Sequence, residues 1–157
     1  MPNKLLILKD SREQKGYDWG EDDFFRGTRI EKIDFGDYSL EGLTHLIFIE
    51  RKASTSELSQ NICEERFKKL LIRARQYKYK YILCEFDYED ILNFPLNSGI
   101  PKWQYKKLKV KPAFMNAFIS RLSVEGFQII FAGNALNAEK FCYSILKYIY
   151  KQEVLNV

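Results

Sequence analysis

Two acidic residues and a lysine have the types and spacing of a site that could hold a metal ion beside a phosphate. Asp37 lies between Gly36 and Tyr38, and Glu50 and Lys52 end the strongly apolar segment 46–52. Because side chains alternate along a strand, Glu50 and Lys52 would share one face, and Asp37 can reach that face from the preceding arm of a hairpin. Carboxylates are preferred ligands of Mg²⁺, and an ammonium can orient or polarise the attacking water.

The alternative for this trio is a salt bridge at the end of a strand. Glu50 and Lys52 directly follow a run of apolar residues, however, so we expect them near the covered interior of a sheet. Charges in such a place need a partner or a function.

Basic residues gather in two segments, although the net charge is only +4. Segment 66–80 holds seven Lys and Arg and no acid, and segment 102–111 holds five Lys and no acid. Such clusters suit a polyanion, because phosphate binding is driven largely by the release of condensed counterions. A solvated helix face or loop is the alternative.

Cysteine and histidine content argues against other site chemistries. Cys63, Cys84 and Cys142 are widely spaced without a CxxC motif, so we expect reduced core thiols. His45 is the single histidine, which argues against a zinc site or a histidine-dependent nucleophile, and we place it in a loop or at a strand edge. No phosphate-binding glycine loop and no long apolar run is present, so the sequence predicts a soluble, cytoplasmic protein without a membrane partner.

The first half of the chain is expected to form the strands that carry the trio. Residues 4–8 are predicted to form a buried strand, and residues 16–27 a surface loop. Residues 29–33 and 38–40 should pair around Gly36 and Asp37, and residues 46–52 form a strong strand.

The second half alternates helices and strands. Ser54 and Glu57 fit a capping box, which predicts a long helix from Ser54 with an apolar stripe to Ala74. The remaining predictions are a strand at 79–86, a loop at 95–112, a helix at 112–125, a strand at 128–132 and a helix at 135–152. This order predicts a single domain over residues 1–157, an α/β fold with a central mixed β-sheet flanked by helices.

Three motifs, in order along the chain, carry a family resemblance. They are Leu6-Ile7-Leu8-Lys9-Asp10-Ser11-Arg12-Glu13, Gly36-Asp37-Tyr38 and Ile49-Glu50-Arg51-Lys52, with support from Arg66-Phe67, Cys84-Glu85-Phe86-Asp87 and Phe131-Ala132-Gly133-Asn134. Together they resemble the nuclease domain of the XPF family of structure-specific endonucleases over nearly the whole chain. The resemblance implies a restriction-endonuclease-like fold that cuts DNA with Mg²⁺ or Mn²⁺ near a junction of duplex and single strand.

The resemblance also implies roles for individual residues. Asp37 and Glu50 would be metal ligands, with Asp10 as a third carboxylate, and Lys52 would position the water or steady the phosphate charge. Arg51 would point to the opposite face by alternation and be structural, unless a bulge turns it toward the phosphate as a catalytic residue.

The sequence departs from the family pattern in two places. The family's aspartate, four residues after the lysine, falls at Ser56, and the neighbouring Glu57 either replaces it or only completes the capping box. Family enzymes commonly carry a tandem helix-hairpin-helix module, which is not found in these 157 residues. The source of substrate targeting therefore stays open, and a partner chain is one candidate.

Several residues outside the trio are candidates for contact with DNA. Arg12 would bind a phosphate or, equally, pair with Asp10 or Glu13, and Trp103 beside the lysines could stack on an unpaired base. The candidates for DNA binding are Arg12, Arg66, Lys102, Trp103, Lys106 and Lys107. Aromatic residues in the last two helices, including Phe118, Tyr143, Tyr148 and Tyr150, predict a homodimer through this end of the chain, as the resemblance also implies.

The sequence thus predicts a metal-dependent endodeoxyribonuclease that cuts branched, flap or forked DNA in repair or recombination. The alternative is a non-catalytic scaffold with a nuclease-like fold that binds DNA and dimerises. Intact Asp37, Glu50 and Lys52 favour the enzyme, whereas the missing aspartate and the missing helix-hairpin-helix module favour the scaffold.

Overall fold

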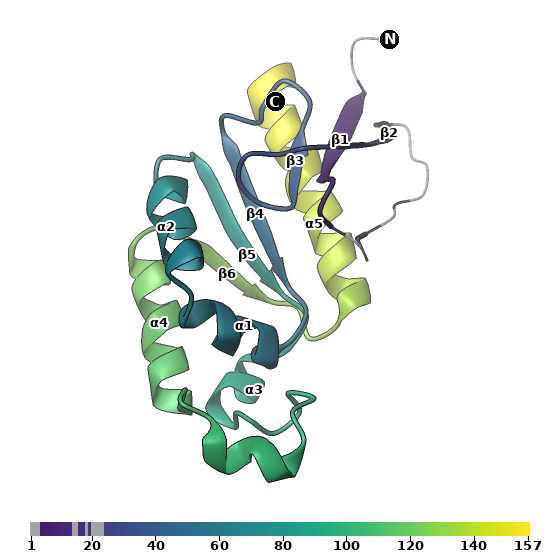
Figure 1. Cartoon of the computed structure of the whole chain (residues 1–157). Coiled ribbons are helices and arrows are strands. Elements are labelled where there is room, and N and C mark those ends of the chain that lie inside the picture. The colour runs from purple at the N-terminus through teal and green to yellow at the C-terminus, as the bar shows by residue number, and fades with distance from the viewer. Residues whose placement is uncertain (1–3, 14–15, 18, 20–23) are drawn as a thin grey trace.

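Six strands form one mixed sheet in the computed structural model, which describes residues 4–13, 16, 17, 19 and 24–157. The strands are β1 (Leu5–Asp10), β2 (Phe25–Glu31), β3 (Tyr38–Leu40), β4 (Ile47–Lys52), β5 (Tyr79–Cys84) and β6 (Gln128–Phe131). Their order in space is β2-β1-β3-β4-β5-β6 (Figure 1). β3 is antiparallel to both of its neighbours, and the other pairs are parallel. The predicted α/β fold with a mixed sheet is confirmed.

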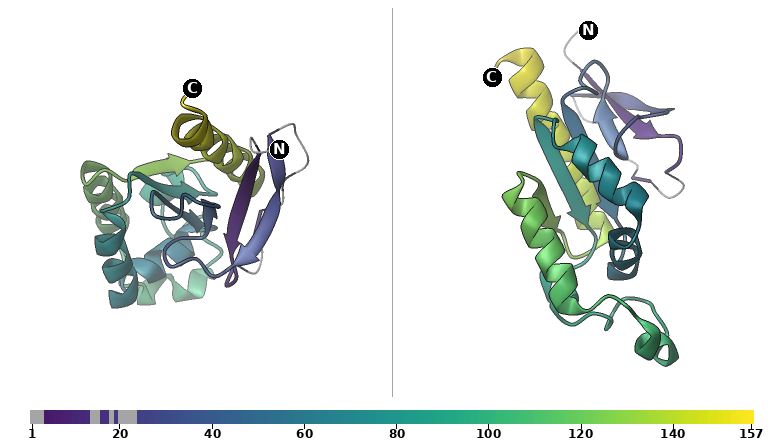
Figure 2. Two further views of the ribbon diagram at one scale, coloured as in Figure 1. Left: turned by 90° about the horizontal axis from the view of Figure 1, so that it is seen from above. Right: turned by 60° about the vertical axis from the view of Figure 1, so that its left-hand side comes forward.

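Helices cover both faces of this sheet. They are α1 (Thr55–Ile62), α2 (Glu65–Ala74), α3 (Tyr88–Leu92), α4 (Pro112–Val124) and α5 (Ala135–Tyr150), with a short 3₁₀ helix η1 (Lys102–Lys107) and a π-helical turn η2 (Lys151–Leu155). α1, α2 and α4 pack on one face, and α5 packs on the other (Figure 2). No helix of the described residues is long and apolar enough to cross a membrane.

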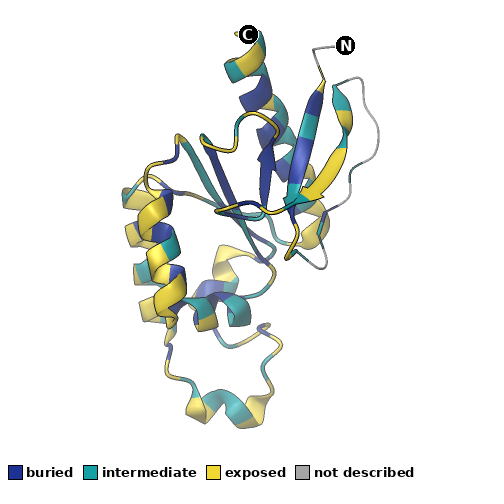
Figure 3. Ribbon diagram, turned by 45° about the horizontal axis from the view of Figure 1, so that its top comes forward, coloured by how far each residue is buried: buried dark blue, intermediate teal, exposed yellow. Residues whose placement is uncertain are grey.

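Strand β4 contributes side chains to two separate cores. Phe48 packs in the core under α1, α2 and α4, whereas Ile47 and Ile49 pack in the core under α5. Burial of each such side chain stabilises the fold by about 1.5–3 kcal/mol. Figure 3 shows the buried residues concentrated along the central strands and the inner faces of the helices. The alternation continues into the polar end of β4 and sets the directions of the site residues.

The predicted pairing of residues 29–33 with 38–40 is wrong. β2 instead lies parallel to β1 at the edge of the sheet, with Asp10 beside Glu31, and β3 inserts between β1 and β4. β2 has polar or exposed residues on both faces, including Ile30 at 66% exposure, so its sequence pattern does not specify its neighbour.

The loop predicted over residues 16–27 is partly corrected. Its last three residues belong to β2, which begins at Phe25, and Tyr17 is buried in the core under α5. Residues 18 and 20–23 of this loop lie outside the described residues.

The predicted single helix from Ser54 to Ala74 is also wrong, because α1 ends at Ile62 and α2 begins at Glu65. Ile62 and Phe67 are both buried. Five residues of continuous helix turn through about 500°, which would place these two side chains about 140° apart. The break between α1 and α2 lets both reach the core.

The predicted start of α1 is confirmed with one change of partner. Ser54 Oγ accepts the amide of Glu57 at 3.1 Å, which satisfies one of the free amides of the first turn. Glu57 Oε2 accepts the amide of Ala53, at 2.8 Å, rather than that of the cap residue. The helix therefore begins where the sequence placed it.

Other predictions differ in detail. β5 ends at Cys84, and the short helix α3 was not predicted, although Asp90 Oδ2 accepts the Asp87 amide at 2.9 Å as a capping residue does. All three cysteines are free, but Cys63 is exposed, which corrects the expectation of three core thiols. His45 is exposed in a turn, as predicted.

Candidate active site

Asp37 lies beside the polar end of β4. Its amide donates to the carbonyl of Ile49 at 2.7 Å, and its Oδ2 accepts the amide of Arg51 at 2.8 Å. Gly36 makes this approach possible, because it has a φ of +88° and a Cβ there would lie 2.8 Å from the Ile49 carbonyl oxygen. The expected convergence of Asp37 on the end of the strand is confirmed.

Lys52 joins Glu50 to the two helices that cover this face. Its Nζ donates to Glu50 Oε1 at 3.0 Å and to Asn61 Oδ1 of α1 at 2.6 Å. It also lies 3.7 Å from Glu57 Oε1 and 4.6 Å from the centre of the Phe67 ring. The side chain of Lys52 is 3% exposed and that of Glu50 is 13% exposed, so the pair occupies the covered interior.

The two carboxylates carry more negative charge than Lys52 neutralises. Burial and the nearby charge of Glu50 raise the pKa of Asp37 well above its ordinary value. Burial also raises the pKa of Glu50, although the charge and hydrogen bond of Lys52 oppose this. Burial alone would lower the pKa of Lys52, but the charges of Glu50, Glu57 and Asp37 and the hydrogen bond to Glu50 together raise it. The site therefore favours a bound proton or another cation.

The free oxygens of this pair fit a hard divalent ion. Asp37 Oδ1 and Glu50 Oε2 have no hydrogen-bond partner among the described residues. Mg²⁺ commonly binds through one or two carboxylates while it keeps several waters. Within the described ranges no three His, Cys, Asp or Glu side chains gather closely enough to enclose an ion.

Asp10, at the end of β1, has other partners. Its carboxylate accepts the Ile33 amide at 2.9 Å and the Arg12 amide at 3.2 Å, and it forms an ion pair with Arg12 Nε at 2.7 Å. Of the open alternatives for Arg12, the structure shows the pairing with Asp10. Asp10 borders the same cavity as Asp37 and Glu50, but its carboxylate is bonded to Arg12 and Ile33.

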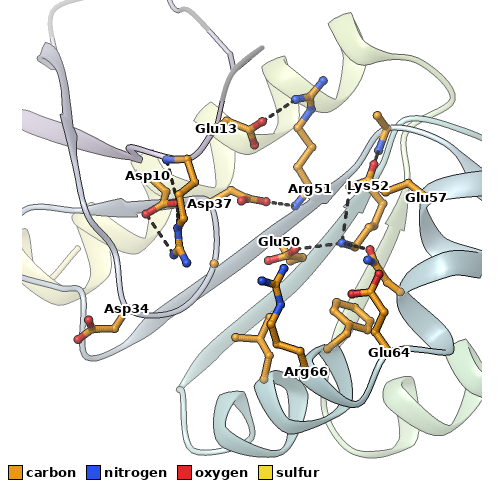
Figure 4. Close-up of a pocket in the computed structure, with 16 residues that line it drawn as sticks. Asp10, Glu13, Asp34, Asp37, Glu50, Arg51, Lys52, Glu57, Glu64 and Arg66 are labelled. Carbon is orange, nitrogen blue, oxygen red and sulfur yellow. Dashed lines mark hydrogen bonds and ion pairs between the residues drawn. The ribbon is translucent and has the colours of Figure 1, made fainter.

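Arg51 points to the face opposite Glu50 and Lys52, as alternation predicts (Figure 4). Its guanidinium pairs with Glu85, with Nη2 3.2 Å from Oε1, and with Glu13, with Nη1 3.1 Å from Oε1. Tyr17 donates to Glu85 Oε2 at 2.6 Å, and its ring lies 5.0 Å from the guanidinium. Arg51 therefore stabilises β4 on the face opposite the carboxylates, and the pairing of β4 with β5 contains no bulge that would turn Arg51 toward them.

A cavity of about 400 Å³ opens over the trio. Figure 4 shows Asp37, Glu50 and Lys52 at its centre, with Arg66 and Glu64 from the start of α2 at one side. Arg12 and Arg66 both line it and are exposed, so two of the predicted DNA-binding residues flank the carboxylates.

The other predicted DNA contacts lie elsewhere. Lys102, Trp103, Lys106 and Lys107 belong to η1, which extends beyond α1 and α3 at the lower end of the view in Figure 1 and does not line the cavity. The Trp103 side chain is 70% exposed, and Lys107 Nζ lies 5.7 Å from its ring centre. This exposed aromatic and basic turn is separate from the carboxylate site.

Two partners of the site were missed by sequence reasoning. Asn61 is four residues after Glu57 on α1, so helical spacing could have placed it on the same face. Tyr17 had no such signal, because it lies in an irregular segment and reaches Glu85 across 68 positions of sequence.

The mixed sheet with helices on both faces is consistent with a restriction-endonuclease-like fold, and acidic residues lie beside a lysine at the polar end of its strand β4. Comparison with solved structures makes the likeness specific. XPF from Aeropyrum pernix matches over 96% of this chain and 67% of its own, with a TM-score of 0.58 and 14% identity. The same protein in complex with DNA matches over 96% and 68%, with a TM-score of 0.62 and 14% identity.

The chain thus has an XPF-like nuclease fold, which confirms the fold expected from the sequence motifs. No protein-family profile and no curated protein sequence matches the chain.

Proposed function

We propose that this protein is an endodeoxyribonuclease that hydrolyses phosphodiester bonds with Mg²⁺ or Mn²⁺. The main support is that Asp37 and Glu50 each present an oxygen without a described partner beside buried Lys52 in an open cavity. Burial raises the pKa of both carboxylates, so a bound cation would favour their ionised forms, and the flanking arginines suit a phosphate backbone. The likeness to an XPF that was solved with DNA supports a DNA substrate.

Each residue of the trio has a distinct part in this reaction. Asp37 Oδ1 and Glu50 Oε2 would hold the ion, which when bound polarises the phosphate and makes its water a better nucleophile. Lys52 favours the ionised form of Glu50 through their 3.0 Å contact, against the burial that raises the pKa of Glu50. Two of the three N–H groups of Lys52 donate to Glu50 and Asn61, and Glu57 lies beyond hydrogen-bond distance at 3.7 Å. The third N–H group can therefore donate to a water or to a phosphate oxygen.

Branched, flap or forked DNA is the proposed substrate class, in repair or recombination. The carboxylate cavity is flanked by Arg12 and Arg66, which suit a backbone, while exposed Trp103 on the separate η1 turn suits an unpaired base. A junction supplies duplex and single strand together, so it could engage both surfaces.

The test is a cleavage assay on labelled single-stranded, duplex, flap and splayed DNA with Mg²⁺, Mn²⁺ or EDTA. Asp37→Asn and Glu50→Gln should each abolish cutting and leave DNA binding measurable. Asp34→Asn is the matched control, because Asp34 lines the same cavity, is exposed and forms no hydrogen bond or ion pair with the trio among the described residues. Its cutting should equal that of wild type. Cutting by both trio variants would refute the proposal. Binding of forked DNA without any cutting by the wild type would favour the scaffold.

We also propose a homodimer through α4 and α5. Tyr148 and Phe141 of α5 and Phe114 of α4 are exposed, whereas Tyr150 is buried and so does not belong to such a surface. Sedimentation that shows a strict monomer at tens of micromolar would contradict the dimer.

A further inference from the structure

We infer that Asp10 is a positioning residue for Arg12, which binds a phosphate of the nucleic-acid strand, and that Asp10 is not a metal ligand. The inference rests on the proposed function, since it assigns a role at the same cavity. It replaces the third-carboxylate role that the sequence motifs implied for Asp10.

The hydrogen bonds of Asp10 leave no room for an ion. Oδ1 accepts the Ile33 amide at 2.9 Å and Arg12 Nη2 at 3.4 Å. Oδ2 accepts the Arg12 amide at 3.2 Å and Arg12 Nε at 2.7 Å. A carboxylate offers about four lone-pair positions, so Asp10 is saturated, whereas Asp37 and Glu50 each keep an oxygen without a described partner.

The electrostatics of Asp10 agree with these contacts. Burial alone would raise the pKa of Asp10, but its hydrogen bonds to Arg12 and to the Ile33 and Arg12 amides lower it. The charge of Asp10 is thus already compensated by protein groups.

Asp10 fixes the direction of an exposed arginine. The side chain of Arg12 is 66% exposed and that of Asp10 is 3% exposed, so a buried anchor holds a surface group. Arg12 Nη2 also donates to the Ile33 carbonyl at 3.0 Å. The two hydrogens of Nη1 have no partner among the described residues, and they remain for a ligand at the cavity that Arg12 lines.

A backbone hydrogen bond connects Asp10 to the candidate metal site. The amide of Asp10 donates to the carbonyl of Asp37 at 2.8 Å, so the end of β1 is held at a fixed offset from Asp37. Figure 4 shows Asp37 between Asp10 and Glu50 in that view. A guanidinium placed in this way presents the two N–H groups of Nη1 to a phosphate next to the carboxylates, as a charged hydrogen-bond donor.

The test separates DNA binding from metal binding. DNA affinity is measured by fluorescence anisotropy in EDTA, and Mn²⁺ affinity is measured by electron paramagnetic resonance without DNA. Arg12→Ala and Asp10→Asn should each weaken DNA binding about tenfold, which is typical for the loss of one charged hydrogen bond. The double variant should be no weaker than Arg12→Ala. Asp10→Asn should bind Mn²⁺ as wild type does.

Arg29→Ala is the matched control, because Arg29 is also an exposed arginine paired with carboxylates but does not line the cavity. It removes the same charge and should leave DNA affinity near that of wild type. Arg12→Lys keeps the charge but loses the planar group, and it should bind DNA as weakly as Asp10→Asn. This variant decides the matter if Asp10→Asn fails to fold.

Three results would overturn the inference. The first is a loss of Mn²⁺ affinity in Asp10→Asn. The second is a loss of DNA affinity in the double variant that equals the product of the two single losses. The third is wild-type DNA affinity in Arg12→Lys. A wild-type protein that binds DNA but not Mn²⁺ would refute the proposed metal dependence instead, and the DNA arm would still decide the role of Asp10.

Discussion

Replacing Lys52 by methionine should expose how strongly the site depends on a buried ion pair. Methionine keeps an apolar stem against Phe67, so the change mainly removes the charge that faces Glu50. Removal of one partner of a buried pair commonly costs 3–5 kcal/mol, and the partial exposure of Glu50 argues for the lower end. We therefore expect a loss of about 3 kcal/mol in unfolding free energy without divalent metal, or about 6–12 °C in Tm.

The loss should depend on pH with a definite sign. Without Lys52, the burial of Glu50 and the negative groups around it, Glu13 and Glu57, all raise its pKa. The folded protein then holds the Glu50 proton more tightly than the unfolded chain does, so its stability falls as the pH rises through the raised pKa. The loss should be larger at pH 8 than at pH 5, and Glu50→Gln in the Lys52→Met background should recover most of it.

Urea denaturation followed by circular dichroism, with EDTA, measures these differences. Lys68→Met is the matched control, because Lys68 makes an exposed pair with Glu65 on α2 and should cost less than about 0.5 kcal/mol. A Lys52→Met loss below about 1 kcal/mol at pH 8, or one equal at both pH values, would refute this description of the ion pair.

Three further predictions concern other parts of the chain. Cys63 is exposed, whereas burial raises the pKa of Cys84 to about 12 and encloses Cys142, so a thiol reagent at pH 8 should label one cysteine per native chain and three in urea. Fast labelling of a second thiol in the native protein would contradict the buried positions. Ser54→Ala removes the side-chain acceptor at the start of α1 and should cost about 1 kcal/mol in urea denaturation, with no loss as the refuting result. Arg66→Ala should lower the slope of log Kd for DNA against log salt by about 1, and an unchanged slope would place Arg66 outside the DNA interface.

Short-range patterns predicted much of the fold. The apolar run before Glu50 predicted β4, and the spacing around Ser54 predicted the start of α1, because both depend on neighbours in sequence. The position of β2 could not be predicted, since a strand with polar residues on both faces pairs according to tertiary geometry. The spacing of the buried residues on either side of Cys63 does not fit one continuous helix, so the break there is a signal that the capping box alone does not provide.

The same distinction holds for the candidate site. The alternation of Glu50 and Lys52 and the nearness of Asp37 to them follow from strand geometry, and the structure agrees. The saturation of Asp10 depends on an amide of Ile33, 23 positions away, and on which of several carboxylates Arg12 selects. Neither is specified by residue type or spacing.

The charges on the two faces of β4 also bear on folding fidelity. Arg51 lies between Glu13 and Glu85, while Glu50 and Lys52 face the opposite side. A slip of one residue would turn every side chain to the other face and set Glu50 or Lys52 where Arg51 now meets two carboxylates. Glu50 there would meet two like charges, and Arg51 would lose its ion pairs with Glu13 and Glu85. The polar end of β4 thereby penalises the slip that brings Glu50 to this position, so a residue that would perform the chemistry also favours the native strand alignment.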